Sequence, residues 1–188
     1  MHLYLVHHGD AVGPEVDPRR PLSAVGQASV DRLADITAKR GVRPDVFWHS
    51  GKLRAKQTAE AFWRACNALA EISASRDLQP GDPPAWMRDR LVGESRDVLI
   101  AGHFPHLPGL LALLHGRQEL AVFPLHGVVA LRTEDDGATW MEEWRLDLRH
   151  PARPQALSKD DPEGRAPEID LVDLASEVSF EQVIESDG

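Results

Sequence analysis

The sequence feature that most constrains the fold is a short apolar run that stops at two histidines and a glycine. Residues 3–6 read LYLV, which is typical of a buried strand in an α/β sheet. His7, His8 and Gly9 follow, and in open α/β sheets ligands sit beyond the carboxyl ends of the strands. We expect Gly9 to let the backbone turn sharply there. The two imidazoles predict a nucleophile, a general base or a metal ligand at this edge, or else ordinary polar residues.

The rest of the chain alternates predicted strands and helices. Apolar spacing, caps and breakers predict helices over residues 24–40, 52–69, 86–92 and 107–114, the first of them capped by Ser23. Strands are expected over residues 45–49, 72–75, 97–101, 128–132 and 139–146, the last two joined around Asp135, Asp136 and Gly137. This order predicts a three-layer α/β/α fold whose central sheet is mostly parallel and ends in an antiparallel hairpin.

Composition divides the chain near residue 150. We expect one folded domain over residues 1–149 and a Pro-rich linker with an acidic tail over residues 150–188, where three basic residues stand against ten acidic ones. The tail is expected either to stay solvated or to form an amphipathic helix that contacts the domain or a partner. A net charge of -9 without a basic face argues against nucleic acid.

The same composition indicates a compartment. No leader and no run of about 18 apolar residues is visible, so neither export nor a membrane span is expected. The single cysteine, Cys66, lies on an apolar helix stripe and fits the core of a protein in a reducing, cytoplasmic environment.

Three predicted strands end in chemically capable residues that can meet at one crevice. His7 and His8 follow the first strand, Ser50 follows the second, and His103 follows the strand over residues 97–101. Arg54 lies about one turn into the next helix, where backbone N–H groups and the helix dipole favour an anion. Imidazoles and a planar guanidinium around one pocket suit a phosphoryl group, which a neutral imidazole can attack.

These residues belong to motifs that resemble the histidine phosphatase superfamily, and more closely its small SixA-type phosphohistidine phosphatases. The resemblance covers about residues 1–148. The matching segments are LVHHGDA at 5–11 against LVRHGEA, RPLS with Gly26 at 20–26 against RPLTxxG, SGKLRAKQTA at 50–59 against SPxxRAxQTA, and AGHFP at 101–105 against GHxP.

The resemblance implies a phosphoglycerate mutase-like fold, a phosphatase and no cofactor. His8 would be the nucleophile that is transiently phosphorylated, while Arg54 and His103 would bind the phosphoryl group with Ser50 beside them. Arg20 would line the entrance. Asp82 matches a loop of the SixA-type chains and is a candidate proton donor, although a turn-forming aspartate between prolines is the favoured interpretation. The substrate would be a phosphorylated protein or a small phosphorylated molecule.

Two positions depart from the family pattern. His7 replaces an arginine, so a bidentate charged donor becomes at most one hydrogen bond toward the phosphate. Gly51 replaces a proline and is expected to loosen the turn after Ser50.

The substitution at position 7 keeps a second hypothesis open, a degenerate member that binds a phosphorylated ligand or partner with little or no turnover. A histidine metal site is disfavoured because adjacent strand residues point to opposite faces.

Overall fold

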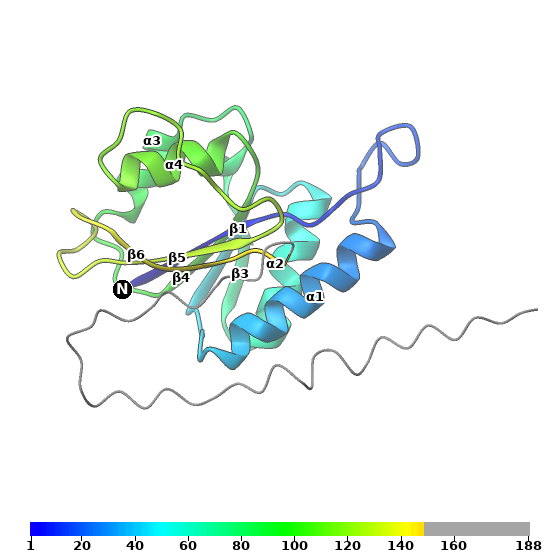
Figure 1. Ribbon diagram of the computed structural model, residues 1–188, viewed down its shortest axis with the longest axis horizontal. Coiled ribbons are helices and arrows are strands. Elements are labelled where there is room, and N and C mark those ends of the chain that lie inside the picture. Colours follow the sequence, from blue (N-terminus) through cyan, green and yellow to red (C-terminus); the bar gives the residue numbers. More distant parts are fainter. Residues whose placement is uncertain (149–188) are drawn as a thin grey trace, which may run out of the picture. The chain divides into compact units, whose positions relative to one another are not determined.

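The computed structural model describes residues 1–148, and its centre is one six-stranded sheet (Figure 1). The strand order is β3-β2-β4-β1-β5-β6. The first four strands are parallel to one another, β5 is antiparallel to β1, and β6 is antiparallel to β5. The predicted fold class is therefore confirmed. The strands are β1 His2–His7, β2 Val46–His49, β3 Glu71–Ala74, β4 Val98–Gly102, β5 Val128–Arg132 and β6 Met141–Leu146.

Helices cover both faces of the sheet. They are α1 Ala24–Lys39, α2 Leu53–Cys66, α3 Pro84–Leu91 and α4 His106–Leu114, with a single 3₁₀ turn at Arg76–Leu78. On one face α1 and α2 pack residues such as Leu33 and Phe62 against alternate strand residues such as Tyr4 and Val6. On the other face α3 and α4 enclose the intervening strand residues, Leu3 and Leu5 among them. Figure 1 shows these two pairs of helices on opposite sides of the strands.

The caps and turns that the sequence predicted are present, with small shifts. Ser23 caps α1 by accepting a hydrogen bond from the Gly26 N–H, and Pro108 lies in the first turn of α4. Asp136 and Gly137 both have positive φ, as the predicted turn requires. Helix α2 ends at Cys66, earlier than the apolar stripe suggested, and Leu69 beyond it is 92% exposed.

Gly9 is required for a different reason from the one expected. Its φ is not positive; instead, a β-carbon there would lie 2.4 Å from Cγ2 of Val30 in α1. Gly26 of α1 is equally restricted, since its β-carbon would meet the carbonyl oxygen of Asp10 at 2.0 Å. Together, these two glycines let α1 pack closely against the chain that leaves β1.

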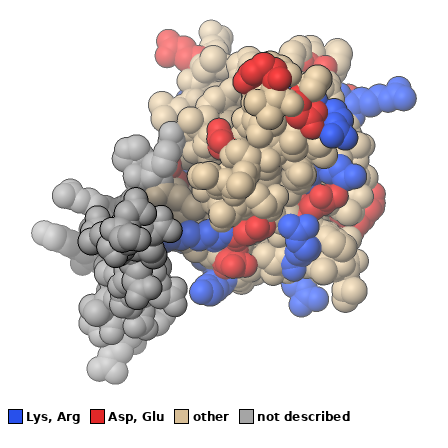
Figure 2. Space-filling view, turned by 90° about the vertical axis from the view of Figure 1, so that its right-hand side faces the viewer, with Lys and Arg blue, Asp and Glu red and all other residues tan. Residues whose placement is uncertain are grey.

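Charged side chains are mixed on the face shown in Figure 2, where lysines and arginines alternate with acidic residues. In residues 1–148, no helix is long and apolar enough to cross a membrane. The predictions about residues 150–188, including the acidic tail, lie outside the described residues, and the domain boundary near residue 150 stays a prediction.

Candidate active site

The carboxyl ends of three adjacent parallel strands bring the predicted site residues together. Strand β4 lies between β2 and β1 in the sheet, so His103, which follows β4, lies between the residues that follow its neighbours. On one side the hydroxyl of Ser50 is 2.6 Å from Nε2 of His103. On the other side the rings of His8 and His103 are 4.9 Å apart. His7, His8, Ser50, Arg54 and His103 thus form one cluster.

His8 is held with one ring nitrogen bonded to the backbone and the other facing Arg54. Its Nδ1 lies 2.7 Å from the carbonyl oxygen of Gly9, and because a carbonyl only accepts, Nδ1 carries the proton. In the neutral ring, Nε2 then has the lone pair, and Nε of Arg54 donates to it at 3.1 Å. This is the tautomer that a nucleophile acting through Nε2 needs.

The pKa of His8 is lowered to about 4. Burial is the main cause, and the nearby charges of Arg54, His126 and Arg20 add to it, while the hydrogen bond to Gly9 opposes it. A lowered pKa keeps the ring neutral at pH 7, and only the neutral ring has a lone pair with which to attack phosphorus.

This lowered pKa predicts an acid-shifted titration of His8. With phosphate-free buffer, we expect its imidazole to titrate near pH 4, against about 6.5 for an unperturbed histidine. The measurement is a pH series of ¹⁵N spectra of histidine-labelled protein, with His8→Ala to assign the signal. Because the folded-state pKa is lowered, the neutral form persists as pH falls until about pH 4; a midpoint near 6.5 would contradict this environment for His8.

His103 is buried beside Ser50, and its two ring nitrogens differ in their surroundings. Its Nε2 is paired with the Ser50 hydroxyl, whereas Nδ1 has no hydrogen-bond partner among the described residues. Burial, together with electrostatic interactions with the neighbouring His8 imidazole and the charges of Arg54 and Lys52, lowers the pKa of His103 to about 3. In either neutral tautomer, one ring nitrogen of His103 carries a proton that can donate a hydrogen bond.

Arg54 and Arg20 supply the positive charge. Arg54 is the second residue of α2, and burial and the charge of Arg20 lower its pKa. Arg20 has a φ of 50° and donates from Nε to the carbonyl oxygen of Val12 at 3.3 Å. Its charge is one of the causes that lower the pKa of His8, and its predicted place at the entrance stays a prediction. Two guanidiniums near three neutral imidazoles make a site suited to an anion.

Side chains of α2 near Arg54 hold the chain between β1 and α1 in place. Oε1 of Gln57 accepts the N–H of Leu22 at 2.7 Å, and Oγ1 of Thr58 accepts the N–H of Gly9 at 3.2 Å. The Thr58 hydroxyl donates in turn to the carbonyl oxygen of Arg54 at 2.8 Å. These bonds couple the position of His8 to that of Arg54.

Gly51 adopts a conformation that the family's proline could not adopt. Its φ is +81°, whereas proline is fixed near -65°. The Gly51 N–H, which proline lacks, donates to Nδ1 of His49 at 3.0 Å. The turn after Ser50 is therefore a different turn, held by its own hydrogen bond.

Asp82 is not joined to the cluster. Its carboxylate accepts the N–H of Gln79 at 2.7 Å, which closes the turn in which both residues lie. Within residues 1–148, no hydrogen bond or ion pair links Asp82 to His7, His8, His103 or Arg54. The loop nevertheless borders the site, because the Gln79 side-chain amide donates to the carbonyl oxygen of Ser50. This geometry favours the turn-forming interpretation.

His7 turns from β1 toward α4. Its ring lies 4.2 Å from that of Phe104 and 4.4 Å from that of His8. Burial is the main cause that lowers its pKa to about 2, and electrostatic interactions with the neighbouring imidazoles of His8, His126 and His103 act in the same direction, so it is a neutral residue where the resembled family has a cation.

His126 belongs to the cluster and was missed by sequence reasoning. Its Nδ1 lies 2.6 Å from the carbonyl oxygen of His8. The signal was available in the predicted hairpin: because β5 runs antiparallel to β1, with Val128 paired to Val6, a residue just before β5 lies beside the end of β1.

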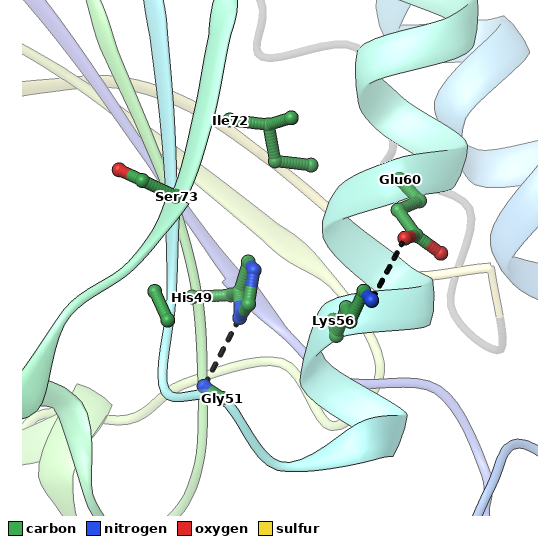
Figure 3. A pocket seen from close by; sticks show the side chains of 7 residues that line it. His49, Gly51, Lys56, Glu60, Ile72 and Ser73 are labelled. Atoms are coloured by element: carbon green, nitrogen blue, oxygen red, sulfur yellow. Dashed lines mark hydrogen bonds and ion pairs between the residues drawn. The ribbon is translucent and has the colours of Figure 1, made fainter.

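The described residues hold no group of three or more histidine, cysteine or acidic side chains arranged to bind a metal ion. A separate hollow of about 520 Å³ lies between β3 and α2 (Figure 3). There the His49 ring bonds to Gly51, and Lys56 and Glu60 form an ion pair at 3.7 Å. None of the clustered imidazoles lines this hollow.

The fold places the chain in the structural class of phosphoglycerate mutase-like proteins, as predicted. The chain is similar to a SixA protein histidine phosphatase solved with tungstate, with 23% identity, a TM-score of 0.68, and coverage of 78% of this chain and 97% of that one. It is also similar to a SixA assigned as a phosphohistidine phosphatase from Agrobacterium tumefaciens, with 24% identity, a TM-score of 0.64, and coverage of 77% and 96%.

A third similar structure is a phosphoglycerate mutase from Plasmodium falciparum, with 16% identity, a TM-score of 0.57, and coverage of 76% of this chain and 88% of that one. No protein-family model and no curated protein matches the sequence. At these identities the structural matches establish a shared histidine phosphatase fold.

Proposed function

We propose that this protein is a phosphatase that works through a phosphohistidine intermediate on His8. Its substrate is phosphohistidine in a protein or a small phosphoester. The observation that carries the proposal is the state of His8: Nδ1–H bonds to the Gly9 carbonyl, and the Nε2 lone pair faces Arg54. The similar structures include SixA proteins described as histidine phosphatases, one of them with tungstate, an oxyanion of phosphate-like shape. The single cysteine supports a cytoplasmic location.

The reaction follows from the positions of these groups. Nε2 of His8 attacks phosphorus, a P–N bond forms, and the bond from phosphorus to the leaving group breaks. Arg54 and His103 donate to the phosphoryl oxygens as charge builds on them. Water then attacks the phosphohistidine, releasing inorganic phosphate and returning neutral His8. When substrate binds, the Arg54 guanidinium must turn from Nε2 of His8 to the phosphoryl oxygens, because the lone pair of Nε2 cannot accept a hydrogen bond from Arg54 and attack phosphorus at once.

The surroundings of the nucleophile favour a good leaving group. The hydrogen-bond partners of His7, His8 and His103 within residues 1–148 are backbone groups, Ser50 and Arg54, with no carboxylate among them. When its second ring nitrogen carries a proton, the imidazole of phosphohistidine leaves as a neutral group whose conjugate acid has a pKa of about 6.5, whereas an alkoxide is a far stronger base, given a pKa of about 15.7 for water. Phosphohistidine or aryl phosphate therefore suits the site better than alkyl phosphate.

The test is to incubate the protein with a phosphohistidine-bearing protein, an aryl phosphate and an alkyl phosphate. After rapid quenching, the chain is searched for acid-labile phosphate on His8. We expect turnover of the first two substrates and phosphate on His8. The absence of both turnover and phospho-His8 would overturn the proposal.

A second candidate function is favoured by the neutral His7, namely binding of a phosphorylated ligand or partner without hydrolysis. Tight binding of a phosphopeptide without product release would support it. An active wild-type protein would exclude it.

His7→Arg separates these two functions and is a prediction in its own right. A charged donor replaces a neutral one, and we expect kcat/KM to rise about 10- to 100-fold, as one charge-assisted hydrogen bond in the transition state allows. Steady-state kinetics on an aryl phosphate measure this change in kcat/KM. His7→Lys is the control, because it adds a positive charge without the paired donors of a planar guanidinium. In a binding protein without turnover, His7→Arg would instead create activity from none. An unchanged rate in an active protein would show that charge at position 7 does not limit the reaction.

A further inference from the structure

His126 occupies a backbone conformation that side chains seldom adopt. Its φ is 55°, in the left-handed region, and Gly127 follows it directly before β5. The carbonyl oxygen of Gly127 accepts the N–H of His7 at 3.1 Å, so this short segment runs beside the end of β1. The His126 ring lies 5.1 Å from that of His7 and 6.2 Å from that of His8.

Two hydrogen bonds join His126 to the two adjacent histidines. Its backbone N–H donates to Nδ1 of His7 at 3.1 Å. Its ring Nδ1 lies 2.6 Å from the carbonyl oxygen of His8, which can only accept, so that nitrogen carries the proton. Left-handed backbone geometry at residue 126 accommodates both bonds at once.

The first of these bonds decides which ring nitrogen of His7 carries the proton. Because Nδ1 of His7 is the acceptor, a neutral His7 must hold its proton on Nε2. Burial and the surrounding imidazoles keep the pKa of His7 low, so the ring is neutral. His7 is thereby a neutral hydrogen-bond donor with a fixed tautomer, at the position where the resembled family has an arginine.

The second bond acts on the nucleophile itself. The Gly9 carbonyl holds the ring of His8 and the His126 ring holds the His8 backbone. A shift of this backbone would move Nε2 relative to Arg54 and His103, and small misplacements of a nucleophile are costly in rate.

We propose that His126 is a positioning residue: its side chain anchors the backbone of the nucleophile His8, and its backbone sets the tautomer of His7. This inference rests on the proposed phosphatase function and names a residue that acts on the same site from the segment before β5. His126 acts through these two hydrogen bonds, which make a neutral histidine useful at position 7.

Two variants of matched backbone preference test the side chain. His126→Gly keeps the left-handed backbone and the N–H but removes the ring. His126→Asn also tolerates positive φ and carries an amide N–H at the place of Nδ1, but it has nothing at the place of Nε2. Since neither variant strains the turn, both are expected to fold, and unfolding temperatures check this.

We expect His126→Gly to lower kcat about 10-fold on an aryl phosphate, the effect of one lost hydrogen bond, with KM unchanged. His126→Asn should restore kcat to near the wild-type value. If His126→Gly matches the wild type, the side chain positions nothing. If His126→Asn is as slow as His126→Gly, the ε-nitrogen is responsible, and the proposal is wrong.

A second readout does not depend on turnover. At pH 8, ¹⁵N spectra of the wild-type imidazoles should show His7 protonated on Nε2 and His126 protonated on Nδ1, the tautomer that free histidine disfavours. The opposite tautomer at either residue would overturn the proposal. If the wild type has neither turnover nor phospho-His8, the phosphatase function fails, while these tautomers still decide the role of His126.

Discussion

Replacement of His8 by alanine is expected to abolish both turnover and phosphoenzyme formation. Loss of a catalytic nucleophile costs about 10³- to 10⁶-fold in kcat. The geometry gives the reason: Nε2 of His8 has the lone pair, and Arg54 lies 3.1 Å from it. His103, whose ring is 4.9 Å away, has its Nε2 paired with Ser50 and so offers no equivalent nucleophile. The measurement is kcat on an aryl phosphate together with mass spectrometry of the quenched protein.

The matched control for His8→Ala is His2→Ala on the same strand. His2 begins β1, at the end of the strand opposite the site, and its Nδ1 lies 3.2 Å from the Asp97 carboxylate. Its removal should leave kcat unchanged and the phosphate on His8. Full turnover in His8→Ala would contradict the assignment of the nucleophile. Covalent phosphate found on His7 or His103 of the wild type would contradict it as well.

The part of the site that could be predicted from sequence is the part built on parallel strands. Residues after β1, β2 and β4 meet because the carboxyl ends of parallel strands share one edge, whatever the exact loop conformations. His8, Ser50 and His103 were found on that basis. Arg54 followed because a residue in the first turn of α2 must lie close to the end of β2.

The rest depended on features that local sequence patterns do not contain. His126 lies just before the antiparallel strand β5, whose exact register sets its position, and its left-handed backbone is uncommon for histidine. Gly9 is required by close packing against Val30, a tertiary contact between distant residues. Asp82 matched a loop motif, but the direction of its carboxylate depends on the turn that it closes with Gln79.

In the proposed mechanism, the charge of Arg54 contributes both to the binding of the phosphoryl group and, after burial, to the neutrality of His8. Its guanidinium can donate to oxyanions, and its charge is one of the causes that lower the pKa of His8. A neutral substitution should therefore change two independent quantities. Transition-state stabilisation falls because a donor is lost, and the pKa of His8 rises because a neighbouring cation no longer disfavours the imidazolium.

We expect Arg54→Ala to lower kcat/KM about 100- to 1,000-fold, the usual cost of one lost oxyanion donor. In the same variant the His8 titration should move upward from about pH 4. Arg54→Lys should be intermediate in rate, since it keeps the charge but not the planar fork.

Arg64→Ala is the matched control, because Arg64 lies in the last turn of the same helix and pairs with Asp31 at 3.7 Å at the surface. Arg64→Ala should leave both quantities unchanged. Should Arg54→Ala and Arg64→Ala behave alike in rate and in the His8 titration, Arg54 would have no part in the site. A loss of rate without any movement of the titration would keep Arg54 as a phosphate ligand and reject its influence on the nucleophile, since burial alone would then hold His8 neutral.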